Sequence, residues 1–194
     1  MVLLKEGERK YMYKFILISG KAGAGKDTIA RILNRKYGFK DYRYADNLKK
    51  ILLFAGWDGK KDLRGRKLLQ TVGGAFRRWD ENFWVDRLIR DIVDDIDRGY
   101  DRFCIADVRH KNELFYFKDY IKKIVPDSKF VHIKVINTLS SLETREMDAE
   151  TITDPSETSL DDITPDYYIY NTVKDNFEFL EIQLDSLIKN EFSD

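Results

Sequence analysis

The segment Gly20-Lys21-Ala22-Gly23-Ala24-Gly25-Lys26-Asp27-Thr28 stands between an apolar run and a helical pattern. The run is Phe15-Ile16-Leu17-Ile18, and the helical face that follows is Ile29, Ile32, Leu33 and Tyr37. A strand, a glycine-rich loop and a helix form the context of a phosphate-binding loop. The glycines let backbone N–H groups turn inward, and the new helix adds unpaired N–H groups and its positive end. The segment therefore predicts an ATP-binding loop in which Lys26 reaches the outer phosphates, and the alternative is a glycine-rich turn before an ordinary helix.

Asp27 is the one break in this pattern, because G-x-x-x-x-G-K-[ST] has serine or threonine at that place. Two unit charges ~4 Å apart repel by roughly 4 kcal/mol at an effective dielectric near 20, so a carboxylate should oppose triphosphate binding. The carboxylate is tolerable if a cation lies between it and the triphosphate. It is also tolerable if it points away from the triphosphate, because an acidic residue in the first turn of a helix interacts favourably with the helix dipole. We expect Asp27 to contact Mg²⁺ directly or through water. Thr28 is the alternative source of a ligand.

Composition excludes several classes of protein. Lys plus Arg and Asp plus Glu both total 34, so the net charge of zero argues against attachment to nucleic acid by bulk charge. Cys104 is the single cysteine, which rules out an intrachain disulfide, and its apolar neighbours predict a buried, inert thiol. His132 alternates with apolar residues, as expected for a histidine on the face of a sheet. No apolar run reaches the ~20 residues that span a bilayer, and the charged N-terminus is not a secretory signal, so we expect a cytoplasmic protein.

Strands and helices alternate along the chain. Strands are predicted at 13–19, 42–45, 102–106, 130–136 and 167–170. Helices are predicted at 26–37, from Asp46 onward, at 63–76 with a break at Gly73-Gly74, at 81–98, and before Pro126. A final helix presents Phe177, Leu180, Leu184 and Leu187 after an Asp175/Glu178 capping box. This order predicts an α/β fold with three layers and a mostly parallel sheet of about five strands.

Length favours one domain over residues 1–194. Residues 47–99 are expected to form a helical acceptor-binding insertion. Residues 138–165 lose apolar periodicity and are expected to form a lid or mobile loop.

Three further side chains are expected near the phosphate loop, because ligands of parallel sheets lie beyond the carboxyl ends of the strands. Asp107, at the end of an apolar strand, is placed to hold Mg²⁺ through water, or is a turn residue. Arg109 could grip the phosphate of an acceptor. Asp46 could orient an acceptor or cap the following helix. Arg145 is the only basic residue between Asn137 and Lys174, which makes it either a catalytic finger or a solvated surface group.

Several segments together resemble one family. They are Gly25-Lys26-Asp27-Thr28, Tyr44 to Lys49, Arg66 to Gln70 with Gly73, Asn82 to Val85, Asp107-Val108-Arg109 with Asn112-Glu113, and Pro155-Ser156-Glu157. Their order and spacing resemble the deoxynucleoside monophosphate kinases of tailed phages, from Ile16 to Leu187. The resemblance implies a P-loop kinase, residing in the host cytoplasm if phage-encoded, that moves the γ-phosphate of ATP onto a deoxynucleoside 5′-monophosphate with Mg²⁺. Asp27 agrees with this family, whereas the single lid arginine departs from adenylate kinase-like lids.

The resemblance also implies an acceptor side. Its candidate residues are Arg66, Gln70, Arg78, Trp84, Glu113 and Glu157. Because Arg77 and Arg78 are adjacent, their roles could be exchanged. A homodimer remains open, and neither a membrane nor a stable nucleic-acid partner is expected.

Two other functions fit the same loop. One is a P-loop kinase of another small acceptor, such as dephospho-coenzyme A or a phosphorylated alcohol. The other is a nucleotide-binding regulator without transfer activity, which the acidic stretch Glu143 to Asp162 would suit. The arginines near positions 66, 78 and 109 favour a kinase.

Overall fold

A computed structural model of the chain describes residues 13–137, 158–171 and 177–192. Its sheet has five parallel strands in the order β2-β3-β1-β4-β5. The strands are β1 (Tyr13–Ser19), β2 (Lys40–Tyr42), β3 (Arg102–Val108), β4 (Ser128–Ile136) and β5 (Tyr167–Tyr170). The described helices are α1 (Lys26–Tyr37), α2 (Ala45–Phe54), α3 (Leu63–Trp79), α4 (Phe83–Asp97), α5 (Lys111–Ile124) and α8 (Phe177–Phe192). The predicted α/β class, three layers and five strands are confirmed.

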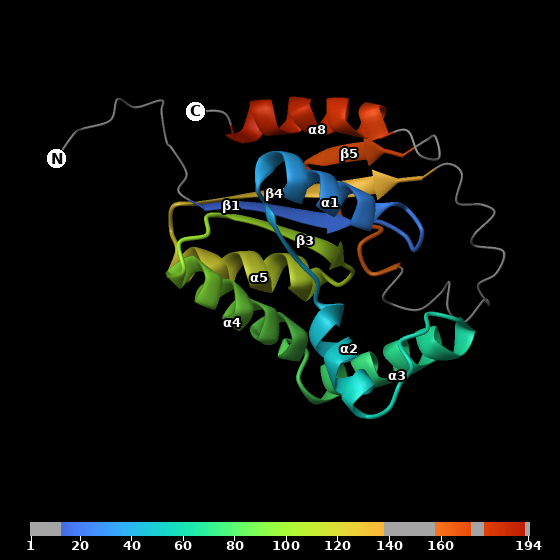
Figure 1. Ribbon diagram of the computed structural model, residues 1–194. Coiled ribbons are helices and arrows are strands. Elements are labelled where there is room, and N and C mark those ends of the chain that lie inside the picture. The colour runs from blue at the N-terminus through green and yellow to red at the C-terminus, as the bar shows by residue number, and fades with distance from the viewer. Residues whose placement is uncertain (1–12, 138–157, 172–176, 193–194) are drawn as a thin grey trace.

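The central strand β1 shows why the sheet is covered on both faces. Ile16 and Ile18 pack in one apolar cluster with residues of α1 and α8, while Phe15 and Leu17 pack in another with residues of α4 and α5. Successive side chains of a strand point to opposite faces, so an unbroken apolar run requires two helical layers. Figure 1 shows these layers, with α1 and α8 on one side of the sheet and α4 and α5 on the other.

Helices α2 and α3 lie beyond the sheet, on the side to which the strand arrows point (Figure 1). They share a small apolar cluster with the start of α4, and its buried members are Leu48 and Leu52 of α2 and Trp84 of α4. The predicted break at Gly73-Gly74 is wrong, because α3 continues to Trp79. A Cβ on Gly73 would lie 3.1 Å from Leu48 Cδ2, and Trp84 Nε1 donates to the Gly73 carbonyl over 3.2 Å. The glycine thus permits close packing instead of ending the helix.

Helix α4 belongs to the main body as well as to this region. Val85, Leu88 and Ile92 join the cluster beneath the sheet, so only the α2–α3 part of the range 47–99 projects from the body. Among the described helices, none is long and apolar enough to cross a membrane.

The second strand and the last helix differ from the sequence-based predictions. The second strand ends at Tyr42 instead of Ala45, because α2 already begins at Ala45. In α8, Phe177 is 48% exposed and does not share the buried face of Leu180, Leu184 and Leu187. Of the predicted lid, 138–157 lies outside the described residues, as does Asp175, and Leu160 is buried in the core.

Candidate functional site

The segment 20–25 forms a loop that only glycine-rich sequence allows. Gly20, Gly23 and Gly25 have φ angles of 141°, 74° and 98°, and Gly25 directly precedes α1. A Cβ at Gly20 would lie 2.7 Å from the Val135 carbonyl oxygen, which real side chains essentially never tolerate. Lys26 is 8% exposed, and its Nζ donates to the carbonyls of Gly20 at 2.5 Å and Lys21 at 2.8 Å. The lysine is therefore folded back over the loop.

Two asparagines hold this loop from the sheet. Asn171, which follows β5, donates from Nδ2 to the carbonyl of Ala24 over 3.1 Å. Asn137, which follows β4, donates to the carbonyl of Gly23 over 3.2 Å. A Cβ on Gly25 would lie 2.4 Å from Asn171 Nδ2 and would displace that amide from the loop, and the φ angle of 98° also favours glycine. Both asparagines donate to loop carbonyls, so these carbonyls point toward the asparagines. This orientation favours loop N–H groups that point away from the asparagines.

A cavity of about 500 Å³ runs from this loop to α2 and α3. Seven cationic side chains line it, namely Lys26, Arg43, Lys49, Lys61, Arg66, Arg77 and Arg109. Two carboxylates, Asp27 and Asp107, face them. In a chain with no net charge, this concentration of cations marks a site for polyanions.

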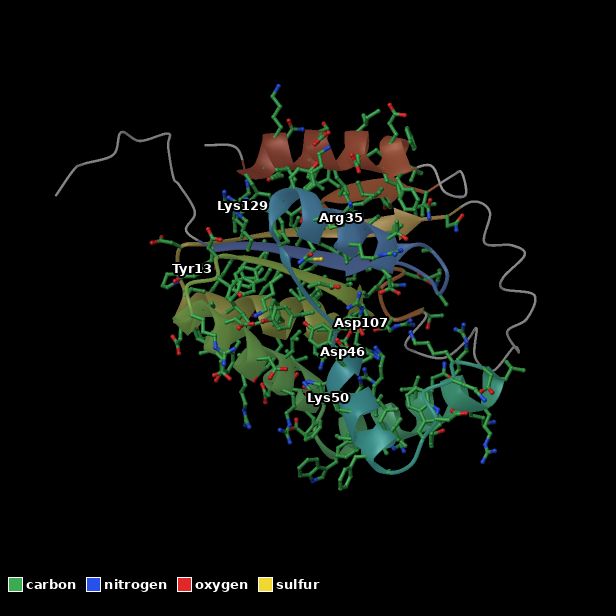
Figure 2. The ribbon with its side chains drawn as sticks, in the orientation of Figure 1. Tyr13, Arg35, Asp46, Lys50, Asp107 and Lys129 are labelled. Carbon is green, nitrogen blue, oxygen red and sulfur yellow. The ribbon has the colours of Figure 1, made fainter. Side chains whose placement is uncertain are left out.

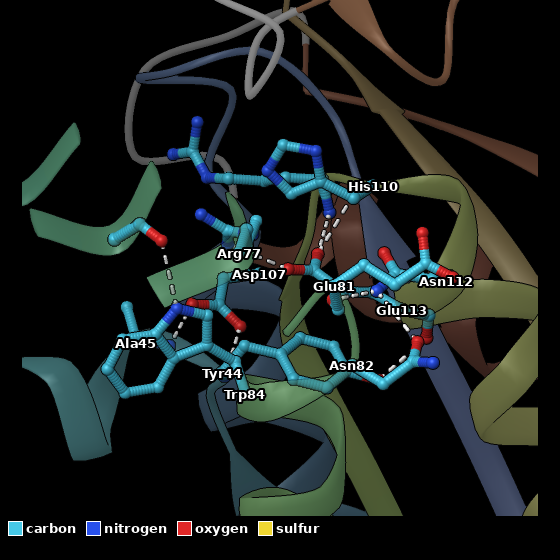
Figure 3. A network of polar contacts seen from close by, with 12 residues as sticks. Tyr44, Ala45, Arg77, Glu81, Asn82, Trp84, Asp107, His110, Asn112 and Glu113 are labelled. Carbon is cyan, nitrogen blue, oxygen red and sulfur yellow. Dashed lines mark hydrogen bonds and ion pairs between the residues drawn. The ribbon is translucent and has the colours of Figure 1, made fainter. Parts of the chain in front are cut away.

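Asp107 fixes the start of α2. Its Oδ1 accepts from the Tyr44 N–H at 2.7 Å, and its Oδ2 accepts from the Ala45 N–H at 3.0 Å (Figure 3). This contact satisfies two donors that a helix start would otherwise leave unpaired. It also explains why α2 begins before Asp46. Burial raises the pKa of Asp107, the nearby Glu113 charge adds to the rise, and the two N–H groups act against it.

Glu113 is 1% exposed and anchors two arginines of the cavity wall. Its Oε1 pairs with Arg77 Nη2 at 3.0 Å, while Oε2 accepts the backbone N–H groups of Arg109 at 2.7 Å and His110 at 3.0 Å (Figure 3). The bond from the His110 N–H is one half of the capping box of α5, and in the other half the His110 side chain accepts from the Glu113 N–H. Glu113 does not line the cavity itself, so the structure places it behind the arginines and not among the groups that reach an acceptor.

Asp27 is 69% exposed at its side chain and faces Arg43. Its Oδ1 lies 3.0 Å from both Nε and Nη2 of Arg43. Arg43 Nη2 also pairs with Asp41 Oδ2 at 2.8 Å. Partial burial acts to raise the pKa of Asp27, but the hydrogen bond and charge of Arg43 outweigh it, and the pKa lies below its ordinary value. The aspartate is therefore ionised and has a partner that the sequence pattern did not reveal.

The remaining predicted acceptor residues divide into two groups. Arg66 and Gln70, on α3, line the cavity, and Arg66 Nε also donates to the Lys61 carbonyl at 3.0 Å. Arg78 is exposed and does not line it, whereas the adjacent Arg77 does. Of the two adjacent arginines, Arg77 is therefore the one that reaches the cavity. Trp84 is 2% exposed and supports the wall through the α2–α3 cluster.

Asp46 is not part of the cavity lining and does not cap α2. It lies inside the helix, where its Oδ1 pairs with Lys49 Nζ at 2.7 Å. Figure 2 marks Asp46 and Asp107 at the far end of the sheet from Tyr13, which begins β1. Arg145 and Glu157 lie outside the described residues.

The described residues contain no cluster of three or more His, Cys, Asp or Glu side chains able to hold a metal ion. That is compatible with Mg²⁺, which proteins usually bind through one or two carboxylates together with substrate phosphates. Asp27 and Asp107 are the carboxylates among the described residues that line the cavity, and both oxygens of Asp107 already accept backbone N–H groups.

Comparisons with known proteins bear on the fold. No family model matches the chain, and no curated protein matches it. The structure resembles that of a "putative kinase" from Chloroflexus aurantiacus, with a TM-score of 0.54 and 13% identity over 91% of this chain and 97% of that one. It also resembles TT1252 from Thermus thermophilus, with a TM-score of 0.50 and 18% identity over 92% and 97%. With the glycine-rich loop between β1 and α1, the chain has the three-layer α/β/α fold of P-loop proteins.

Proposed function

We propose that this chain is an ATP-dependent kinase that transfers the γ-phosphate to a deoxynucleoside 5′-monophosphate. The observation that carries the proposal is one continuous cavity lined by the phosphate loop, by Arg66 and Arg77 of α3, and by Arg109, which also lies beside Gly20 and Lys21. A kinase with a phosphorylated acceptor must place two anionic ligands in one space, which needs cations at both ends. The resemblance to a structure described as a kinase adds support for the reaction type.

In the proposed reaction, an oxygen of the acceptor phosphate forms a bond to the γ-phosphorus, and the bond from that phosphorus to the β-bridging oxygen breaks. ADP leaves with that electron pair, and the acceptor becomes a diphosphate. Lys26 and the loop N–H groups hold the triphosphate. Arg77 and Arg109 hold the acceptor phosphate, and their positions are set by Glu113. Mg²⁺, held near Asp27 and Asp107, would offset charge on the phosphate oxygens.

The α2–α3 wall is proposed to receive the sugar and base. Leu48 and Leu69 offer an apolar surface beside the amide of Gln70. An apolar surface with a few polar groups is the usual composition of a site for a flat heterocycle. Arg145 and Glu157 remain proposed as the catalytic finger and an acceptor-side group.

A panel of acceptors tests the proposal. ATP consumption is measured with the four common deoxynucleoside monophosphates, their ribose counterparts, dephospho-coenzyme A and phosphorylated alcohols. We expect the highest kcat/KM with one or more deoxynucleoside monophosphates, and no turnover with Lys26→Ala. Faster turnover of dephospho-coenzyme A or an alcohol would assign another acceptor. ATP binding without turnover of any acceptor would indicate a regulator.

A further inference from the structure

Asp27 presents a physical problem that neither the loop nor its neighbours in sequence solve. The carboxylate lines the cavity next to Lys26 and would repel a triphosphate there. The carboxylate does not interact with solvent alone, because two nitrogens of Arg43 contact it. The cation that makes the aspartate tolerable thus comes from the residue that follows β2, across the neighbouring strand β3.

A second carboxylate also holds Arg43. Arg43 Nη2, which contacts Asp27, pairs as well with Asp41 Oδ2 at 2.8 Å, and the Asp41 side chain is 20% exposed. The other oxygen of Asp41, Oδ1, is buried and has no hydrogen-bond partner among the described residues. Asp41 therefore depends on Arg43, and a guanidinium held by two carboxylates loses little further freedom when a nucleotide binds.

We infer that Arg43 is a positioning residue for ATP, acting as the built-in counter-ion that lets Asp27 stand at the end of the phosphate loop. This inference rests on the proposed function, because it concerns the same ATP site. Both contacts of Arg43 go to Oδ1 of Asp27, so the other carboxylate oxygen, Oδ2, lies outside them and can face a metal-bound water. Arg43 shields the carboxylate when magnesium is absent, and magnesium adds to the shielding when present.

The inference predicts a specific dependence on magnesium. Without the Arg43 charge, Asp27 repels the triphosphate unless a metal ion screens it. Arg43→Met should therefore weaken ATP binding about tenfold or more in a chelator, but only about two- to threefold at saturating Mg²⁺. Adding Asp27→Asn to Arg43→Met should restore most of the affinity in the chelator, because the repelling charge is gone.

The experiment is calorimetric titration with ATP, in EDTA and in excess Mg²⁺, of the wild type, Arg43→Met, Asp27→Asn and the double variant. Arg43→Lys keeps a cation and should stay within about threefold of the wild type in EDTA. Lys49→Met is the matched control, since Lys49 lines the same cavity but pairs with Asp46. Any loss of ATP affinity in Lys49→Met should be equal in EDTA and in Mg²⁺. Adding Asp27→Asn to Lys49→Met should not restore the affinity. Thermal melting of each variant identifies any that fail to fold.

The outcomes separate the two proposals. If the wild type binds ATP but Arg43→Met and Arg43→Lys both keep wild-type affinity in EDTA, the inference is overturned and the kinase proposal stands. The inference is also overturned if Arg43→Met loses the same ATP affinity in EDTA and in Mg²⁺ and the added Asp27→Asn does not restore that affinity. If the wild type binds no ATP in either buffer, the proposed function fails first.

Discussion

The two ends of the cavity are built in different ways. The phosphate loop is one continuous segment, 20–28, and rests on the central strand of a sheet whose two faces are fully packed. The α2–α3 wall consists of side chains from separate elements over a cluster with three buried members. It also exposes large apolar groups, with Phe54 at 96% and Trp79 at 75%. Backbone geometry makes the first end, and contacts between distant residues make the second.

This difference indicates where each end is sensitive. Changes at the phosphate loop should affect chemistry and leave acceptor binding alone. Changes at the wall should affect acceptor binding first, because few buried contacts fix its shape.

The largest expected effect is at the loop. Lys26→Ala should lower kcat about 1,000-fold, since a positioned cation typically supplies about 4 kcal/mol to a developing phosphoryl charge. Steady-state kinetics measure it. Lys36→Ala, in the last turn of the same helix and paired with Asp185, is the control and should keep wild-type kcat. A loss of less than about tenfold for Lys26→Ala would mean that this lysine does not act on the phosphates.

The sheet beneath the loop should be sensitive to acid. Burial, and then the charge of Lys118, lower the pKa of His132 to about 4, and its Nε2 lies 2.8 Å from Ser19 Oγ. The unfolded chain therefore takes up a proton near pH 6.5 that the folded chain refuses until about pH 4. The free energy of unfolding should be fully retained above pH 6.5 and fall by about 3 kcal/mol toward pH 4. Urea unfolding at pH 7 and pH 4.5 should show a smaller fall for His132→Asn, and an equal fall would refute the assignment.

After β3, between the loop and the wall, Arg109→Ala should raise KM for the acceptor about 30-fold and KM for ATP much less. A charged hydrogen bond to phosphate contributes about 2 kcal/mol. Arg109→Lys should not restore the KM, because lysine lacks the planar pair of donors. Equal effects on both substrates would instead move Arg109 to the ATP end.

The neighbouring arginines of α3 give an internal comparison. Arg77→Ala should raise the acceptor KM about tenfold, since Arg77 lines the cavity, while the exposed Arg78→Ala should change it by less than about twofold. Initial rates over a range of acceptor concentrations distinguish the two. A larger effect for Arg78 would support the original sequence-based assignment.

The smallest effect concerns the supports of the loop. Asn171→Ala should weaken ATP binding about fivefold, because one neutral hydrogen bond to the Ala24 carbonyl contributes about 1 kcal/mol. Gln183→Ala, which loses bonds to Tyr170 but none to the loop, is the control and should bind ATP as the wild type does. If the two variants bind ATP equally well, Asn171 does not shape the site.

The same contrast explains what the sequence could predict. Spacing within 13–37 is enough to identify the strand, the loop and α1, because their contacts are local or follow a simple period. The sheet and its layers follow from apolar runs that need cover on both faces.

The acceptor end depends on pairs that spacing cannot reveal. Arg77 meets Glu113 across 36 positions, and Tyr44 meets Asp107 across 63. For this reason the family resemblance predicts Glu113 on the acceptor side, and the local glycine pair predicts a helix break at Gly73, whereas Glu113 lies behind the arginines and the helix continues. Arg43 was missed for the same reason, although an unpaired aspartate in the loop was a signal that a cation was needed nearby.

The central claim is that phosphate moves from the loop end of the cavity to the wall end. The direct measurement uses ATP labelled with radioactive phosphorus at the γ position, mixed with each deoxynucleoside monophosphate, and follows the label by chromatography. The account predicts labelled deoxynucleoside diphosphate with the wild type and none with Lys26→Ala. Label that stays in ATP, or appears only as inorganic phosphate with every acceptor, would contradict it.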